Sequence, residues 1–209
     1  MLHQKTVEPR TLELLKDLMR IEELKAFALL GGTSLSLRWG HRQSEDLDLF
    51  SNQFFEEDRL IEALESKYPN LTISLQQKQT LRLFIENVKI EIIAPKRPYL
   101  KPFEDIGGIR FFSAEDAMAF KMNAIERRGS RKDFYDLAEA LHHFSLTDLI
   151  GFYQQKFSTH DLAHLIKSIA YFEDAEQDFE PNIYKPRTWD KTKKIIQTHL
   201  QNYLKNLVG

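Results

Sequence analysis

Residues 31–50 read GGTSLSLRWGHRQSEDLDLF, and this stretch decides the fold class. The apolar run Phe27–Leu30 comes directly before it and stops at the two glycines, which is typical of a buried strand that ends in a turn. A short helix is predicted to follow, with Thr33 or Ser34 near its N-cap. Glycines let backbone N–H groups approach a phosphate closely, and a helix N-terminus favours an anion. The turn is therefore a candidate phosphate site.

Asp46–Phe50 alternates polar and apolar residues, which predicts a strand. Side chains two residues apart on a strand point to the same side, so Asp46 and Asp48 share one face. Two carboxylates placed in this way can hold hard divalent cations, and paired cations can assist phosphoryl transfer. An isolated Asp-x-Asp is a weak signal by itself, because it occurs by chance in many solvated strands.

A third carboxylate stands in the segment VKIEII, residues 88–93. Apolar residues occupy one face of this predicted strand, and Lys89 and Glu91 occupy the other. A strand that otherwise looks buried should not carry an acid without a partner. Glu91 is therefore a candidate metal ligand. The alternative is that it pairs with a lysine or faces water.

The remaining pattern divides the chain into two halves. Residues 1–112 mix helical and alternating segments, and residues 113–209 are helical throughout. We therefore predict an α+β protein with a mixed β-sheet flanked by helices, followed by a C-terminal helical region. Helices are predicted over 9–24, 56–68, 113–127, 130–143, 147–157, 160–170 and 188–207, and strands over 71–76, 81–85, 88–94 and 109–112.

The segment KMNAIERRGSRKDFYDL, residues 121–137, gathers several cations. Lys121 and Arg128 are two helical turns apart and share a face. Lys132 and Asp133 begin the next helix, where the spacing of Ser130 and Asp133 predicts a capping box. A triphosphate would need such a cluster of cations. The alternative is an ordinary helical corner in which neighbouring acids neutralise these cations.

Composition excludes several classes of protein. The chain has no cysteine, which excludes disulfide frameworks, Cys-ligated zinc and thiol catalysis. It has 29 Lys and Arg and 31 Asp and Glu, so it lacks the strong excess of positive charge that is typical of a nucleic-acid coat protein. The N-terminus has no secretory signal, and the apolar runs are too short to span a membrane. We therefore expect a cytoplasmic protein without a membrane partner.

Charge is unevenly distributed near the C-terminus. Residues 173–180 carry five acids and no base, whereas six Lys or Arg and one Asp follow from Lys185 onward. One interpretation is a solvated loop followed by an exposed helix, and the other is a basic helix that faces RNA or a partner. Trp189 and Tyr184 could stack on RNA bases, although a docking contact for the last helix is the simpler use.

Three segments together, LLGGTSLSLRWGHRQSEDLDLF, VKIEII and KMNAIERRGSRKDFYDL, resemble the AbiEii/AbiGii family of toxin nucleotidyltransferases within the DNA polymerase β-like superfamily. They span about residues 29–137. The resemblance implies transfer of a nucleoside monophosphate from an NTP to an acceptor, with Mg²⁺ or Mn²⁺ as cofactor. It also implies the toxin of a type IV-like toxin–antitoxin or abortive-infection system. The expected acceptor is a tRNA 3′ end, and the expected partner is an antitoxin encoded by a neighbouring gene.

The resemblance also implies roles for individual residues. Asp46 and Asp48 would bind metal, and Glu91 stands where the family usually has a third acid, often Asp. Lys121 and Asp133 would be catalytic, with Asp133 either activating the acceptor or holding Lys132. The residues expected at the phosphates are Gly31, Gly32, Thr33, Ser34, Arg42, Ser44, Arg128 and Lys132.

Two other functions remain open at this point. A nucleotide-binding protein without transfer activity would keep the same residues and act through a partner. The presence of Glu91 where the resembled family often has Asp favours this alternative. A phosphatase or sugar transferase is the third possibility. The aspartyl-phosphatase pattern requires a Thr shortly after the pair, but Leu49-Phe50-Ser51 follows here.

Overall fold

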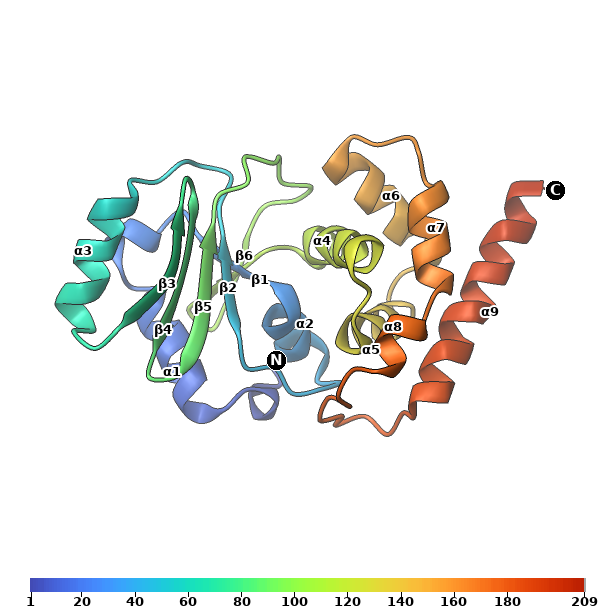
Figure 1. Cartoon of the computed structure of the whole chain (residues 1–209), viewed down its shortest axis with the longest axis horizontal. Helices are drawn as coiled ribbons and strands as arrows, with labels where there is room; N and C mark the ends of the chain where they lie inside the picture. Colours follow the sequence, from blue (N-terminus) through green and yellow to red (C-terminus); the bar gives the residue numbers. More distant parts are fainter. Residues whose placement is uncertain (209) are drawn as a thin grey trace. The chain divides into compact units, whose positions relative to one another are not determined.

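The computed structural model describes residues 1–208 and divides the chain into two compact units (Figure 1). The first runs from Met1 to Ser113, and the second begins at Ala114. Each unit has its own buried core, and each is described by itself.

The first unit is built on a seven-stranded mixed sheet with the strand order β3-β4-β5-β2-β1-β7-β6. At its centre, β2 runs antiparallel to β1 and parallel to β5, while β1 runs parallel to β7. The predicted α+β class with a mixed sheet is thereby confirmed. The strands are β1 (Ala28–Leu30), β2 (Leu47–Phe50), β3 (Thr72–Gln77), β4 (Thr80–Ile85), β5 (Val88–Ile93), β6 (Glu104–Ile106) and β7 (Ile109–Phe111).

Three helices flank this sheet. Figure 1 shows α1 (Pro9–Leu18) and α3 (Glu57–Lys67) on one face and α2 (Gly31–Trp39) on the other. Leucines of α1 and α3 pack in one core with alternate residues of β2 and β5. Burial of this apolar surface orients the central strands, because the polar residues between the apolar ones must then point to the opposite face.

Three local predictions in the first unit were wrong. The first helix ends at Leu18 rather than residue 24, and a separate 3₁₀ turn covers Glu22–Leu24. The short strand β6 was not predicted, since its sequence, EDI, has no clear alternation. Helix α2 begins at Gly31 with Leu30 as its N-cap, so Thr33 is inside the helix rather than at the cap.

The second unit is entirely helical. Helix α4 packs against α5, α6 and α7, and the long helix α9 also packs against these three. Ser130 and Asp133 form the predicted capping box at the start of α5. None of the helices in residues 1–208 is long and apolar enough to cross a membrane. The helices are α4 (Ala114–Arg127), α5 (Arg131–Ala140), α6 (Leu146–Phe157), α7 (Ala163–Ala170), α8 (Glu173–Glu176) and α9 (Trp189–Val208).

Candidate active site

The carboxylate of Asp48 lies against the first residue of α2. Gly31 has a φ of +69°, and a Cβ at this position would lie 1.9 Å from Asp48 Oδ2. Strand pairing causes the approach, because Leu30 at the end of β1 is in register with Asp48 on β2. A side chain at residue 31 would therefore meet both backbone strain and a direct overlap. Glycine at this position keeps the carboxylate next to the N-terminus of the helix.

Arg42 and Ser44 cover the next residue, Gly32. A Cβ on Gly32 would lie 2.4 Å from an Arg42 guanidinium nitrogen and 3.2 Å from Ser44 Oγ. Arg42 is buried, and its guanidinium also donates to the Gln43 carbonyl at 2.9 Å. A cation at a helix N-terminus adds to the positive end of the helix dipole, so the first turn of α2 is suited to an anion.

Thr33 and Ser34 are placed differently from expectation. Both side chains are fully buried. The Thr33 hydroxyl donates to the Asp46 carbonyl and lies 2.9 Å from Ser44 Oγ. Thr33 thus fixes the segment that leads into β2 instead of presenting its hydroxyl to solvent. The groups of this turn that can meet a phosphate are the backbone N–H groups at Gly31 and Gly32.

Asp48 lies on β2, whereas Asp46 comes directly before this strand, which begins at Leu47 rather than at the predicted residue 46. Leu47 and Leu49 are completely buried on one face of β2, whereas both aspartates are half-buried. Their oxygen atoms form a donor set that fits a hard divalent cation such as Mg²⁺. Burial of Leu47 and Leu49 therefore places the Asp48 carboxylate on the opposite face of the strand.

Glu91 is in register with Asp48 on the neighbouring strand β5. Its carboxylate already has two partners, Arg82 Nε at 2.7 Å and Lys89 Nζ at 3.0 Å. Burial opposes ionisation of Glu91, but these two cations outweigh it, and the pKa of the carboxyl lies below its ordinary value. Residues 1–208 contain no group of three or more His, Asp or Glu side chains arranged to hold a metal ion.

The second unit brings Lys121, Asp133 and Asp136 together in its interior. Lys121 Nζ lies 2.8 Å from Asp133 and 2.7 Å from Asp136, and all three side chains are buried. Burial opposes ionisation of Asp133, but Lys121, Ser130 and Arg128 outweigh it and lower the pKa of the carboxyl. The cluster joins α4 to α5 and holds the Lys121 ammonium in one position.

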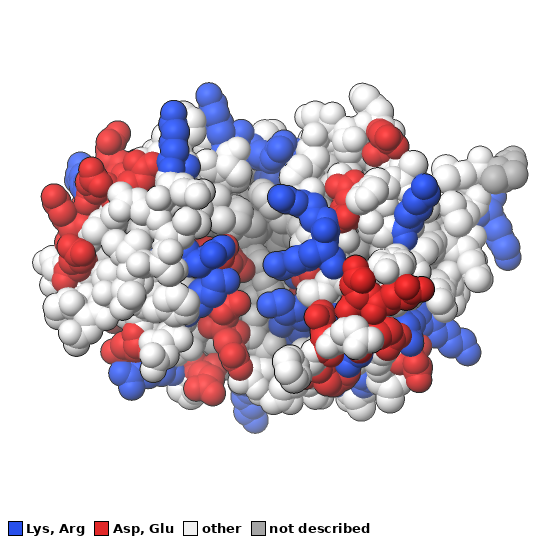
Figure 2. Space-filling view, viewed as in Figure 1, with Lys and Arg blue, Asp and Glu red and all other residues white. Residues whose placement is uncertain are grey.

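Arg128 and Lys132 are exposed at the same corner. Arg128 lies 3.5 Å from Asp133 while 65% of its side chain remains accessible. The partners of Asp133 are Lys121, Ser130 and Arg128 rather than Lys132. Figure 2 shows Lys and Arg side chains gathered over α4, and Asp and Glu side chains gathered over α8.

The sequence profile described as "Nucleotidyl transferase AbiEii toxin, Type IV TA system" matches residues 13–202, which is most of the chain. The chain belongs to the AbiEii nucleotidyltransferase toxin family. The family is one of enzymes, so this AbiEii-family protein is a nucleotidyltransferase.

Relatives of this AbiEii-family protein match it over most of its length. An uncharacterized protein of Aquifex aeolicus is 30% identical over 200 residues, which cover 93% of this chain and 96% of that protein. The fold is similar to that of JHP933 from Helicobacter pylori, with a TM-score of 0.56, 22% identity and coverage of 96% and 94% of the two chains. It is also similar to MenT4, a nucleotidyltransferase toxin from Mycobacterium tuberculosis, with a TM-score of 0.54, 16% identity and coverage of 90% and 82%.

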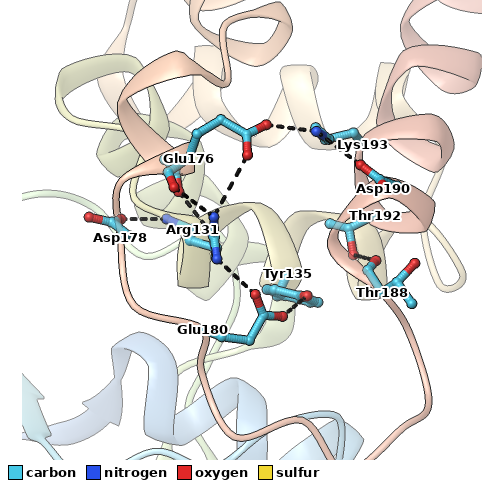
Figure 3. Close-up of polar contacts among 10 residues, drawn as sticks. Arg131, Tyr135, Glu176, Asp178, Glu180, Thr188, Asp190, Thr192 and Lys193 are labelled. Carbon is cyan, nitrogen blue, oxygen red and sulfur yellow. Dashed lines mark hydrogen bonds and ion pairs between the residues drawn. The ribbon is translucent and has the colours of Figure 1, made fainter.

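The structure of this AbiEii-family protein also reveals a residue that the sequence did not single out, Arg131 (Figure 3). Its guanidinium contacts Glu180 at 2.8 Å and donates to the carbonyls of Ala175 and Glu176 at 2.9 Å. Its backbone N–H donates to Asp178 at 2.8 Å. The acidic segment 173–180 is therefore bound to the start of α5 and is not a freely solvated loop. The concentration of acids in residues 173–180 is the feature of the sequence from which this contact could have been predicted.

Trp189 completes this region from the first turn of α9. Its ring lies 5.8 Å from the Tyr135 ring and 6.0 Å from the rings of Phe134 and Phe172. The Arg131 guanidinium lies 5.0 Å from the Trp189 ring centre. The docking role is thus confirmed for Trp189, because these contacts attach the last helix to α5.

Proposed function

We propose that this protein transfers a nucleoside monophosphate from an NTP to the 3′ end of an RNA, with tRNA as the first acceptor to test. The observation that carries this proposal is the contact between Gly31 and Asp48. It places an acidic face of the sheet directly beside a helix N-terminus that suits phosphate. Membership of a nucleotidyltransferase toxin family supports the same reaction class.

In the first unit, the backbone N–H groups at Gly31 and Gly32 would receive phosphate oxygens, and Arg42 and Ser44 would support them. Asp46 and Asp48 would hold Mg²⁺ or Mn²⁺, because their carboxylate oxygens are ligands of the type that these ions prefer. When bound, the metal would supply positive charge against the phosphates. Glu91 is proposed as the third acid, and its ion pairs with Arg82 and Lys89 compete with that role.

In the second unit, Arg128 and Lys132 are the accessible cations proposed to stabilise phosphate charge. Lys121 is proposed to act from a fixed position, since two buried carboxylates hold its ammonium. Asp133 is then best described as a residue that positions Lys121. Its contact with Ser130 also fixes the start of α5, which carries Lys132.

The direct test is incubation of the purified protein with total tRNA, Mg²⁺ and each labelled NTP in turn. We expect label in RNA with at least one NTP, and no label without a divalent cation. Asp46→Ala and Asp48→Ala should abolish labelling while the circular dichroism spectrum is preserved. Asp58→Ala, which removes an exposed carboxylate on α3, is the matched control and should label normally. Labelling that survives both active-site substitutions would contradict the assignment.

We propose that the protein is the toxin of a toxin–antitoxin pair. Expression should arrest growth, and co-expression of the product of the adjacent gene should restore it. Growth arrest that persists in Asp46→Ala would show that toxicity does not depend on nucleotide transfer.

A second candidate function is nucleotide binding without transfer. The engagement of Glu91 by Arg82 and Lys89 favours it, because the third acid is then not free to join the aspartates. Calorimetric binding of an NTP, together with no labelled product from any tRNA pool, would support this function over the first.

A further inference from the structure

We propose that residues 95–103, PKRPYLKPF, form a binding surface for the RNA acceptor, and this inference rests on the proposed function. We call this segment the basic loop. It connects β5 to β6 and contains three cations, three prolines and no acid. The cations are Lys96, Arg97 and Lys101. Figure 2 shows Lys and Arg side chains standing out where Figure 1 draws this loop.

The basic loop begins at the end of the two strands that carry the candidate acids. The Ser51 N–H donates to the Ile93 carbonyl at 3.0 Å, so β2 and β5 end side by side. Asp48 lies three residues before Ser51, which places it about 10 Å from this edge along the strand. An RNA bound at the loop would thus have its chain within a few nucleotides of the carboxylates.

An aromatic cluster anchors the basic loop to the sheet. Tyr99 packs on Phe103 and Phe112, with ring centres 4.6 and 5.3 Å apart, and Phe103 lies 4.9 Å from Phe112. The Asn52 N–H donates to the Tyr99 hydroxyl at 2.9 Å. The prolines restrict the backbone further. The cations are therefore presented from a preorganised segment, which reduces the entropy lost on binding.

Lys96 and Phe54 supply a second feature expected of an RNA surface. The Lys96 ammonium lies 5.2 Å from the centre of the Phe54 ring. The Lys96 backbone has a φ of +50°, which non-glycine residues rarely adopt. The Phe54 side chain is 62% exposed. Exposed aromatic rings beside cations bind single-stranded nucleic acid by stacking and by phosphate contact.

The test measures binding of a fluorescent tRNA to the full-length protein without NTP or divalent cation. The variant Lys96→Gln/Arg97→Gln/Lys101→Gln should bind tRNA about tenfold more weakly. The slope of the logarithm of the binding constant against the logarithm of the salt concentration should become shallower by about two. Phe54→Ala should weaken binding without changing that slope. In the labelling assay the KM for tRNA should rise while the KM for NTP stays unchanged.

The matched control is Arg10→Gln/Lys16→Gln/Lys67→Gln. It also removes three positive charges, and Arg10 and Lys67 lie beside the turn between β4 and β5, at the opposite end of β5 from the basic loop. This variant should bind tRNA like the wild type. Lys96→Arg/Lys101→Arg should also retain wild-type affinity.

The inference would be overturned if Lys96→Gln/Arg97→Gln/Lys101→Gln bound tRNA with wild-type affinity. It would also be overturned if the control variant lost as much tRNA affinity as this loop variant. If the wild type binds tRNA through the loop but labels no RNA, the proposed function fails and the binding surface stands.

Discussion

Gly31 and Asp48 are in direct contact, with no space between the glycine α-carbon and the carboxylate for a methyl group. The pairing of β1 with β2 imposes this contact, and the positive φ of Gly31 allows it. It therefore connects the start of α2 to the acidic face of the sheet.

We expect Gly31→Ala to abolish nucleotide transfer and to destabilise the first unit. Gly107→Ala is the control, because Gly107 has nearly the same φ of +66° but open space around its Cβ position. The backbone cost shared by both variants should be about 1–2 kcal/mol. Urea unfolding should show a larger loss for Gly31→Ala, and equal losses would show that the contact with Asp48 is unimportant.

Lys89→Ala should raise the pKa of Glu91 toward its ordinary value of 4.5. Lys89 is the stronger of the two cations that hold this carboxylate ionised. The shift can be measured by carbon-13 NMR titration of the Glu91 carboxyl. Lys78→Ala removes a lysine from the hairpin turn between β3 and β4 and should leave the titration unchanged. An unmoved Glu91 in Lys89→Ala would show that its ion pair does not persist in solution.

Lys121→Met should destabilise the second unit by about 3–5 kcal/mol, because two buried carboxylates would lose their shared cation. Lys132→Met is the control, since this side chain is exposed, and its cost should be within about 0.5 kcal/mol. Thermal unfolding followed by circular dichroism measures both. Similar melting temperatures for the two variants would argue against the buried cluster.

Asp133 should make stability sensitive to acid. Its pKa is lowered in the folded protein, so its contribution is complete above the ordinary value of 3.8 and is lost as the pH falls through the folded value. Unfolding free energies measured from about pH 6 to pH 2 should therefore fall less steeply for Asp133→Asn than for the wild type. The same slope in both proteins would contradict the assigned shift.

Arg131→Ala should release the acidic segment 173–180 from the start of α5. Arg131 binds that segment through Glu180 and two backbone carbonyls. Hydrogen exchange should accelerate across 173–180, and limited proteolysis should cut there first. Arg127→Ala, at an exposed position at the end of α4, serves as the control. Unchanged exchange in Arg131→Ala would mean that other contacts hold the segment.

The sequence by itself determined the elements whose pattern is local. Alternation around Leu47 and Leu49 predicted the strand and the side to which Asp48 points, because burial of every second residue fixes the direction of the others. The Ser130–Asp133 spacing likewise predicted a capping box that needs only neighbouring residues. These features depend on short-range geometry, which the residue order contains.

Only the tertiary structure decided which partners the charged residues take. Glu91 meets Arg82 across β4 and β5, Lys121 meets Asp133 and Asp136 between two helices, and Arg131 binds a segment more than forty residues away. Any of these charges could have faced water in an extended chain. Strand register and helix packing bring them together, and burial then requires that each be neutralised by a neighbour.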